Sequence, residues 1–264
     1  SPVSTPVICA YARTPFGRFR GALANYTAVE LGTLAVKGVL QRAGIDPRSG
    51  IIDQIYMGQV LQAGAGQAPA RQVAMSAGLP YSTPCTTVNK VCGSSLKAVM
   101  IAATEIMAGR SNVVIAGGME SMSQAPHFIR GARRGDEISF AELTGILSHD
   151  GLKDAYDGSM MGITGETIAE EANISRSESD QYALRSHNLS NSAWQKGWLA
   201  EECVFMDELD QDEGIRMDTS MEGLAGLRTV FKEDGQVTAG NASQVSDGGS
   251  AVLIASEEIA NENG

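Results

Sequence analysis

The sequence predicts an α/β fold: a layered core around a mostly parallel, mixed sheet, interrupted by a long inserted segment. Three observations lead to this prediction. The first 118 residues alternate between short β-branched runs and segments of helical periodicity, a pattern typical of layered α/β domains. The run NVVIAGG, residues 112–118, is wholly apolar, as strands covered on both faces are. Strand-like texture is then lost after residue 119 and returns only at GSAVLIASEE, residues 249–258.

The first predicted elements are a strand, a helix and a second strand. VICAY, residues 7–11, is a short β-branched run. From Thr27 onwards, apolar residues recur close to the helical period. Thr27 and Glu30 have the spacing of a capping box, and Gly44 is a suitable C-terminal stop. IIDQIYMGQVL, residues 51–61, predicts the next strand.

Two further helices and one strand complete the predicted first part of the core. APARQVAMSAG, residues 68–78, predicts a short helix, and PCTTVNKV, residues 84–91, predicts a strand. A helix follows Cys92 and ends at Gly109. Its residues are so consistently apolar that we expect this helix to be fully buried.

Residues 119–240 differ in texture from the rest of the chain. They are rich in Gly, Ser and Met and lack a steady period, except for one long helix that Ser175 and Glu178 open with a second capping box. We therefore expect a core formed by residues 1–118 and 241–264, with residues 119–240 inserted as a separate domain.

Composition narrows the function classes. The net charge of −11 disfavours nucleic acid and anionic membranes as partners. No apolar run reaches membrane-spanning length, and the first residues lack the pattern of a secretory signal. The cysteines have no CxxC spacing and lie far from the histidines, which disfavours a zinc site and a disulfide framework. We expect a cytoplasmic protein without a metal site, with structural roles for the histidines. The residues concerned are Cys9, Cys85, Cys92 and Cys203, and His127, His149 and His187.

Cys92 is the first candidate for chemistry. It stands between a predicted strand and a predicted helix, in NKVCGSSLKAV. Free N–H groups and partial positive charge at a helix start favour a thiolate, the nucleophilic form of cysteine. Gly93, Ser94 and Ser95 are small enough to let a substrate carbonyl approach the sulfur, and N–H groups of the turn can receive an oxyanion. The alternative is that Cys92 is a buried, inert cysteine. The position of Cys92 in the sequence does not by itself decide between this alternative and a nucleophile.

Five motifs follow one another along the chain. They are RTPFGRFRGAL from Arg13, NKVCGSSLKAV around Cys92, GGMESMSQAPH from Gly117, MGITGE from Met161 and VTAGNASQVSDGGSAVLIAS from Val237. Together, and in this order, they resemble the thiolase family of acyl-CoA acetyltransferases over essentially the whole chain. GGMESMS is most similar to the biosynthetic acetoacetyl-CoA branch. Two positions depart from the family: Ser95 replaces a usual glycine, and Met160 stands where many biosynthetic members have histidine, which leaves the substrate length open.

The resemblance implies a thiolase-like three-layer α/β/α core, with residues 119–240 as a loop domain that binds coenzyme A. In the family, the cysteine aligned with Cys92 takes the acyl group as a covalent intermediate, and its own N–H contributes to the oxyanion hole. Coenzyme A and acetyl-CoA are then substrates, and no permanently bound cofactor is expected. The positions that match the family's coenzyme A pocket are Leu152, Met161, Arg216, Gly223, Leu227, Phe231, Ala239 and Ser243.

The chemistry of these residue types fits those roles, but each has a plainer alternative. Arg216 offers a planar, charged fork for adenine or a phosphate, although an arginine in an acidic segment is more often a solvated ion-pair partner. Leu227 and Phe231, at i and i+4, are expected to form one apolar wall for pantetheine, although LRTVF is more often core. Ala239 and Ser243 bracket a tight turn where backbone can approach a ligand.

By the same resemblance, the chain corresponds to the N-terminal half of a thiolase. The family's second half carries an Asn-Glu-Ala segment, a Gly-His-Pro histidine and a Cys-x-Gly cysteine, and none of these motifs occurs in this sequence. We expect the whole protein to condense two acetyl-CoA molecules to acetoacetyl-CoA, or to run the reverse thiolysis, and this chain alone to be inactive. The alternatives are a degradative 3-ketoacyl-CoA thiolase with longer substrates and a non-catalytic acyl-CoA-binding or dimerisation module. The resemblance also implies a homodimer or homotetramer.

Overall fold

The computed structural model describes residues 4–264, which form two compact units. The first unit contains the chain up to Pro126 together with Glu202–Glu213 and Ser246–Gly264. The second unit contains His127–Glu201 and Gly214–Val245.

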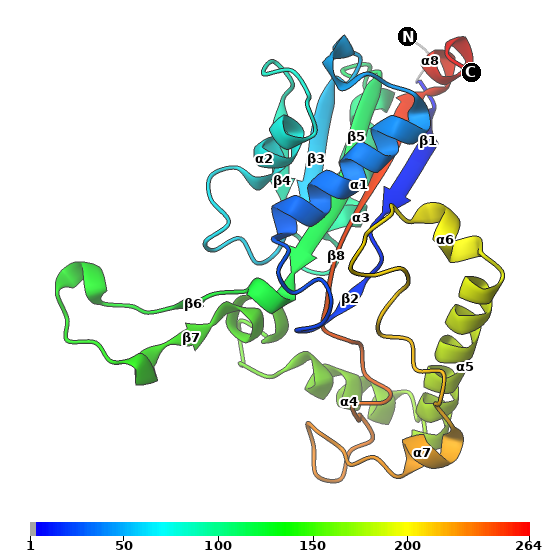
Figure 1. Cartoon of the computed structure of the whole chain (residues 1–264). Helices are drawn as coiled ribbons and strands as arrows, with labels where there is room; N and C mark the ends of the chain where they lie inside the picture. The colour runs from blue at the N-terminus through cyan, green and yellow to red at the C-terminus, as the bar shows by residue number, and fades with distance from the viewer. Residues whose placement is uncertain (1–3) are drawn as a thin grey trace. The chain divides into compact units, whose positions relative to one another are not determined.

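The first unit is built on one mixed sheet, in which the strands lie in the order β1, β8, β5, β3, β4, with β2 paired to β8 (Figure 1). β3 pairs in parallel with β4 and β5, whereas β8 is antiparallel to β1, β2 and β5. The predicted fold class is confirmed, but parallel pairs are fewer than expected, because β8 enters between β1 and β5 in the opposite direction. The strands are β1 (Pro6–Arg13), β2 (Gly17–Arg18), β3 (Gln54–Gly58), β4 (Cys85–Val88), β5 (Val113–Ser121) and β8 (Ser246–Ser256).

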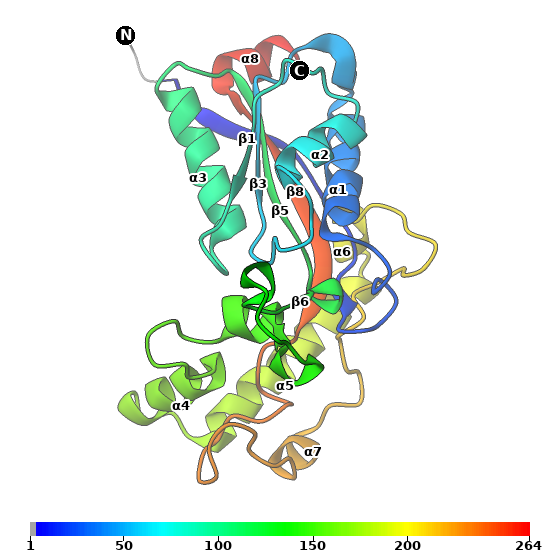
Figure 2. The same ribbon diagram turned by 90° about the vertical axis from the view of Figure 1, so that its left-hand side faces the viewer.

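Helices cover both faces of this sheet and give the three-layer α/β/α arrangement (Figure 2). α1 (Ala28–Ala43) and α2 (Pro69–Ser76) lie on one face, and α3 (Ser94–Met107) lies on the other. β5 is buried between them: Ile115 packs in the cluster with α1 and α2, and Val114 packs in the cluster with α3. The wholly apolar run of the sequence is therefore a central strand.

The first helix begins and ends as predicted. The Thr27 hydroxyl accepts the Glu30 N–H at 3.1 Å, and the Glu30 carboxylate accepts the Thr27 N–H at 3.1 Å. Gly44 ends α1 in the left-handed conformation, with φ 64°. α1 packs closely on β8 because Gly249 has no side chain: a Cβ there would lie 2.4 Å from the Leu31 carbonyl oxygen.

The expectation that the helix after Cys92 is fully buried is wrong. The face of α3 that packs on the sheet is made of small residues, such as Ala98 and Ala102, both 0% exposed. On the outer face, Leu96 and Met100 are 70% and 59% exposed. The four-residue spacing of small side chains places Ala against the sheet and turns the larger apolar side chains outwards.

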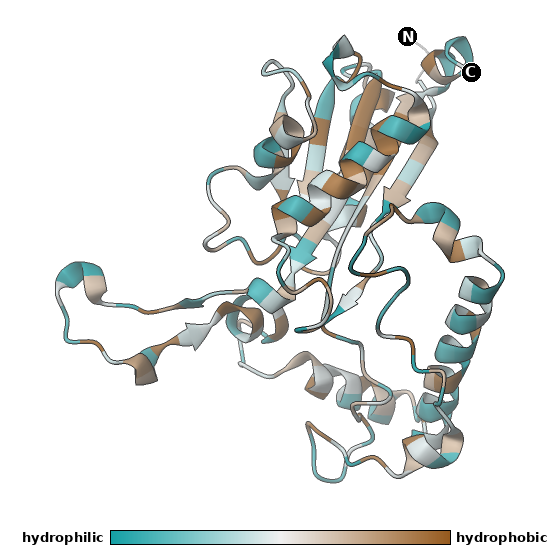
Figure 3. Cartoon of the chain, viewed as in Figure 1, coloured by the Kyte–Doolittle hydropathy of each residue, from teal (hydrophilic) through white to brown (hydrophobic). Residues whose placement is uncertain are grey.

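The second unit is mainly helical, and within the described residues it adds no strand to the main sheet. Its long helix, α5, begins with the predicted capping box of Ser175 and Glu178. Figure 3 colours α5 as largely hydrophilic, in contrast to the hydrophobic stretch of β5. The remaining elements of the fold are β6 (His127–Phe128), β7 (Thr144–Gly145), the π-helical turn Leu147–Leu152, α4 (Met161–Glu171), α5 (Arg176–Gln195), α6 (Trp198–Glu202), α7 (Met221–Ala225), α8 (Glu257–Glu262) and four 3-10 turns, Pro47–Ser49, Met122–Gln124, Ala132–Arg134 and Phe140–Glu142.

Two segments of the expected insertion belong to the first unit, residues 119–126 and Glu202–Glu213. Arg13 at the end of β1 forms ion pairs with Glu202 at 2.8 Å and with Asp212 at 2.7 Å. The Val204 N–H also donates to the Arg13 carbonyl at 2.8 Å. These contacts explain why Glu202–Glu213 groups with the core in the structure.

Candidate active site

Cys92 lies in a tight turn between β4, which ends at Val88, and α3, which begins at Ser94. Gly93 is the N-cap of α3. Cys92 therefore lies between the strand and the helix, as the sequence predicted. Its side chain is exposed in this chain, so the alternative of a buried, inert cysteine does not describe it.

The turn is held by hydrogen bonds from both sides of Cys92. The Ser94 hydroxyl donates to the Val91 carbonyl at 2.5 Å and accepts the Lys90 N–H at 2.8 Å. The Asn89 side chain accepts the Val91 N–H at 3.0 Å. Ser94, which the sequence suggested only as a small neighbour, is the residue that closes this turn.

Val91 has a strained backbone, with φ 49°. A β-branched residue disfavours this left-handed conformation, which costs about 1–3 kcal/mol. The turn keeps this conformation because the hydrogen bonds of Ser94 and Asn89 over-determine it. Backbone strain of this kind is typical of sites where a side chain has to be presented in one orientation. Here the residue that follows the strained position is Cys92.

The start of α3 offers backbone donors next to this turn. Gly93 has no side chain to cap the helix, so no capping side chain takes the first N–H groups of Ser95 and Leu96. The end of β3 approaches this helix start closely: a Cβ on Gly58 would lie 2.8 Å from the Ser94 carbonyl carbon and the Ser95 nitrogen. The turn thus combines an exposed sulfur with N–H groups that can stabilise negative charge.

The other cysteines differ in accessibility. Burial raises the pKa of Cys203 to about 11, and burial also raises the pKa of Cys85. Cys9 is exposed, although its β-branched context in the sequence favours burial. The pairing register of β1 and β8 shifts between Ile8 and Ala10, which leaves Cys9 in a bulge.

Brief iodoacetamide treatment of the folded chain should alkylate Cys92 first. The sulfur is exposed and lies beside uncapped N–H groups, whereas the raised pKa values of Cys85 and Cys203 lower their thiolate fractions. Cys9 is the matched exposed control. Peptide mapping measures the order, and alkylation of Cys85 or Cys203 before Cys92 would contradict this account of the turn.

The eight candidate coenzyme A positions all lie in the second unit. Most are exposed, and Leu152 and Phe231 are half-buried. The Phe231 ring lies against Gly162, the neighbour of Met161, where a Cβ would clash with it. A hydrogen bond of 2.6 Å from the Gln244 side chain to the Gly214 carbonyl joins the segments that carry Ser243 and Arg216.

Leu227 and Phe231 do not share a helix, which corrects the expected apolar wall. α7 ends at Ala225, so the i, i+4 spacing has no helical meaning here. Leu227 instead lies against Gly240, where a Cβ would be 2.5 Å from the Leu227 Cδ1. Leu227 is thereby placed beside the turn that begins at Ala239 and ends at Ser243.

Arg216 is fixed through its backbone and leaves its side chain exposed. Its N–H donates to the Nδ1 of His187 at 3.0 Å, which gives this histidine a structural role. Among the described residues, the Arg216 guanidinium forms no salt bridge. The expected alternative of an ion-pair partner is therefore not what the structure contains.

Acidification should destabilise the Arg216 segment. Burial, with a smaller contribution from Arg216, lowers the pKa of His187 below its usual value of 6.5. In the pH range between the lowered and the usual pKa, the unfolded chain binds more protons than the folded chain, so stability falls as the pH falls. A protonated Nδ1 also cannot accept the Arg216 N–H. Urea unfolding of the parent chain and of His187→Gln is measured from about pH 7.5 to about pH 5.5. The free energy of unfolding should fall more steeply with falling pH in the parent chain. Equal slopes for the two proteins would mean that His187 does not cause this pH dependence.

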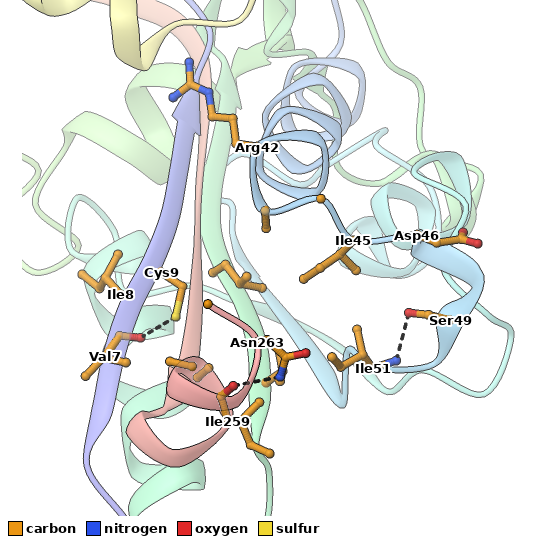
Figure 4. A pocket seen from close by; sticks show the side chains of 17 residues that line it. Val7, Ile8, Cys9, Arg42, Ile45, Asp46, Ser49, Ile51, Ile259 and Asn263 are labelled. Atoms are coloured by element: carbon orange, nitrogen blue, oxygen red, sulfur yellow. Dashed lines mark hydrogen bonds between the residues drawn. The ribbon is translucent and has the colours of Figure 1, made fainter.

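A cavity of about 820 Å³ lies in the first unit, between the end of α1 and α8. Figure 4 shows Cys9 at its wall, with Arg42, Ile45 and Ile259 among the surrounding side chains. The lining contains neither Cys92 nor a candidate coenzyme A residue. This cavity is therefore separate from the residues that the sequence singled out.

Residues 4–264 contain neither a cluster of metal ligands nor a membrane-spanning helix. The described His, Cys, Asp and Glu side chains form no group of three or more that could hold a metal ion. None of the described helices combines the length and the hydrophobicity that a membrane crossing requires.

Similarity to known proteins extends over nearly the whole chain. The thiolase N-terminal domain matches residues 6–258. The chain belongs to the thiolase family. It is 45% identical to the acetyl-CoA acetyltransferase of Chromobacterium violaceum and 43% identical to that of Cupriavidus necator, over 97% and 98% of this chain and 67% of each relative. The crystal structure of the Bacillus anthracis acetyl-CoA acetyltransferase superposes with a TM-score of 0.93 at 36% identity, over 99% of this chain and 68% of that one. This thiolase chain thus spans about two thirds of the length of these relatives.

Proposed function

We propose that the protein is a thiolase-type acyltransferase in which Cys92 accepts an acetyl group from acetyl-CoA. The observation that carries this proposal is the exposed cysteine on a strained, hydrogen-bonded turn at the uncapped start of α3. Membership of the thiolase family supports it, because the resemblance of NKVCGSSLKAV to the family's nucleophile motif puts Cys92 at the acyl-accepting position.

In the first half-reaction, the Cys92 thiolate attacks the carbonyl carbon of acetyl-CoA. The carbonyl oxygen becomes an oxyanion, which the Cys92 N–H and the uncapped N–H groups at the start of α3 stabilise. The bond from that carbon to the coenzyme A sulfur then breaks, coenzyme A takes a proton, and the acetyl group remains on Cys92 as a thioester.

In the second half-reaction, a base removes a proton from C2 of another acetyl-CoA. The resulting carbanion attacks the acetyl carbon on Cys92, the bond to the Cys92 sulfur breaks, and acetoacetyl-CoA leaves. The resemblance places the groups for this step outside the present sequence, so the full reaction is proposed for the whole protein and not for these 264 residues alone.

The second unit is proposed to bind coenzyme A. Most of its candidate residues are exposed, and the Arg216 fork, which forms no salt bridge with another described residue, is suited to a phosphate or an adenine ring. No resident cofactor is invoked. The alternatives remain a degradative thiolase with longer acyl chains, which Met160 in place of histidine leaves open, and a non-catalytic acyl-CoA-binding module.

The cytoplasm is the proposed location, because all four cysteines are free and reduced thiols persist in that compartment. The proposed partners are acyl-CoA substrates and further copies of the same chain.

The protein should form a homodimer or homotetramer through its α/β core. Large apolar side chains such as Leu96 and Met100 are exposed on α3, and exposed apolar surface favours association. Sedimentation velocity at micromolar concentration measures the mass in solution. Sedimentation as a monomer at every concentration tested would be the opposite result.

The experiment for the proposed function is an assay of the whole protein in both directions. Condensation of acetyl-CoA and thiolysis of acetoacetyl-CoA are followed alongside a 3-ketoacyl-CoA with a long chain. Turnover of acetoacetyl-CoA supports the proposal, and preference for the long chain supports the degradative alternative. Binding of coenzyme A without turnover of any substrate would leave only the binding module.

A further inference from the structure

Asn241 is the centre of a hydrogen-bond network in the second unit. Its Oδ1 accepts the Thr238 N–H at 2.8 Å. Its Nδ2 donates to the Gln236 carbonyl at 2.9 Å and to the Asp180 carboxylate at 3.0 Å. The amide therefore closes the turn that contains Ala239 and, at the same time, attaches this turn to α5.

Asp180 continues the network towards a second segment. Its carboxylate, 1% exposed, also accepts a hydrogen bond from Arg176 Nε at 3.0 Å. Arg176 Nη2 then donates to the carbonyls of Leu224 at 2.7 Å and Leu227 at 3.0 Å. A continuous set of hydrogen bonds thus joins the segment that carries Gly223 and Leu227 to the Asn241 turn.

A second anchor holds the strand-like stretch just before this turn. The Glu166 carboxylate, on α4 and 5% exposed, accepts the Gln236 N–H at 2.8 Å and the Val237 N–H at 2.6 Å. The Gln236 side chain donates to the Ile174 carbonyl at 2.6 Å. Both ends of residues 236–241 are therefore tied to helices by buried or half-buried polar groups.

Such a network fixes positions more than it adds stability. A buried ion pair such as Arg176–Asp180 is often no more stabilising than apolar side chains of the same volume. Apolar contact between Leu227 and Gly240 could hold the two segments together without fixing their register. Directed hydrogen bonds to named carbonyl and N–H groups do fix it, and a fixed register holds a bound ligand in one geometry.

We propose that Asn241 and Asp180 are positioning residues for the coenzyme A thioester. They hold the segment of Gly223 and Leu227 and the turn of Ala239 in one relative placement, and so preorganise two walls of the binding site without touching the reacting atoms. The inference rests on the proposed function, because it assigns coenzyme A to these segments.

The test compares Asn241→Ala and Asp180→Asn with Asn188→Ala in the whole protein. Asn188 is exposed on the same helix, α5, and is the matched control for loss of an asparagine side chain. Calorimetry with coenzyme A should give a Kd about tenfold higher or more for Asn241→Ala and Asp180→Asn. The KM for acetyl-CoA should rise by the same factor, with kcat at saturation and the iodoacetamide rate of Cys92 unchanged.

The split between KM and kcat separates positioning from folding. Loss of folded protein lowers kcat per mole and leaves KM as it was, so that pattern overturns the proposal. A Kd for Asn241→Ala within about twofold of the parent also overturns it while leaving the proposed function intact. If the parent protein itself fails to bind coenzyme A, the proposed function is wrong. The positioning role, which rests on it, is then wrong as well.

Discussion

Replacing Cys92 by alanine is expected to abolish acyl transfer, with a loss of at least about 10⁴-fold in kcat for the whole protein. The expected loss is large because the variant has no sulfur to carry the acetyl group between the two half-reactions. The fold should be unaffected, since the Cys92 side chain is exposed and the turn is held by Ser94. The measurement is steady-state thiolysis of acetoacetyl-CoA, with a thermal melt to confirm folding.

Cys9→Ala is the matched control for this variant. Cys9 is a second exposed thiol in the same unit, and its loss should leave turnover unchanged. If the Cys92→Ala variant retained turnover within about tenfold of the parent, another group would have to accept the acyl chain. The role assigned to Cys92 would then be wrong.

Replacing Arg216 by alanine is expected to raise the Kd for coenzyme A by about tenfold to a hundredfold. A charge-assisted hydrogen bond from a guanidinium to a phosphate is worth about 1.5–3 kcal/mol, and each 1.4 kcal/mol is about tenfold in affinity. Arg216→Lys should recover only part of the loss, because lysine keeps the charge but not the planar fork. Calorimetric titration with coenzyme A measures each Kd.

Arg185→Ala controls for the change in net charge. Arg185 is exposed on α5 and belongs to the same unit, so its removal changes long-range electrostatics similarly without removing the proposed contact. Equal losses for the Arg216 and Arg185 variants would contradict a direct contact with the ligand. An effect of Arg216→Ala that disappears in dephosphorylated coenzyme A analogues would identify the phosphate as the contact.

The elements that the sequence predicted well depend on local rules. The capping box of Thr27 and Glu30 and the glycine stop at Gly44 act within a few residues, and the buried strand β5 (Val113–Ser121) has an unbroken apolar run. The capping box at Ser175 is local in the same way. Signals of this kind are contained in a short window of sequence, so they can be found without a structure.

The features that the sequence missed depend on contacts between distant residues. The outward face of α3 follows from small side chains packing on the sheet, and the antiparallel placement of β8 follows from its pairing with β1 and β5. The attachment of Glu202 to the core requires Arg13, which is 189 residues away. No local period encodes these pairings.

The candidate site likewise combines features that a short stretch of sequence predicts with features that depend on the folded structure. The motif around Cys92 pointed to the cysteine, but not to the left-handed backbone of Val91, which only the closed turn imposes. Asn241 lies within a quoted motif, yet its pairing with Asp180 could not be expected from spacing. Leu227 and Phe231 have helical spacing in a segment where the helix has already ended.

The central claim is that Cys92 itself carries the acetyl group. The most direct measurement is to incubate the whole protein with acetyl-CoA, quench with acid, and map the acetylated peptide by mass spectrometry. The account predicts one acetyl group on the peptide that contains Cys92, and its removal when free coenzyme A is added before the quench. Acetylation that resides on Cys9 or on lysine side chains, or an acetyl group on Cys92 that free coenzyme A does not remove, would contradict it.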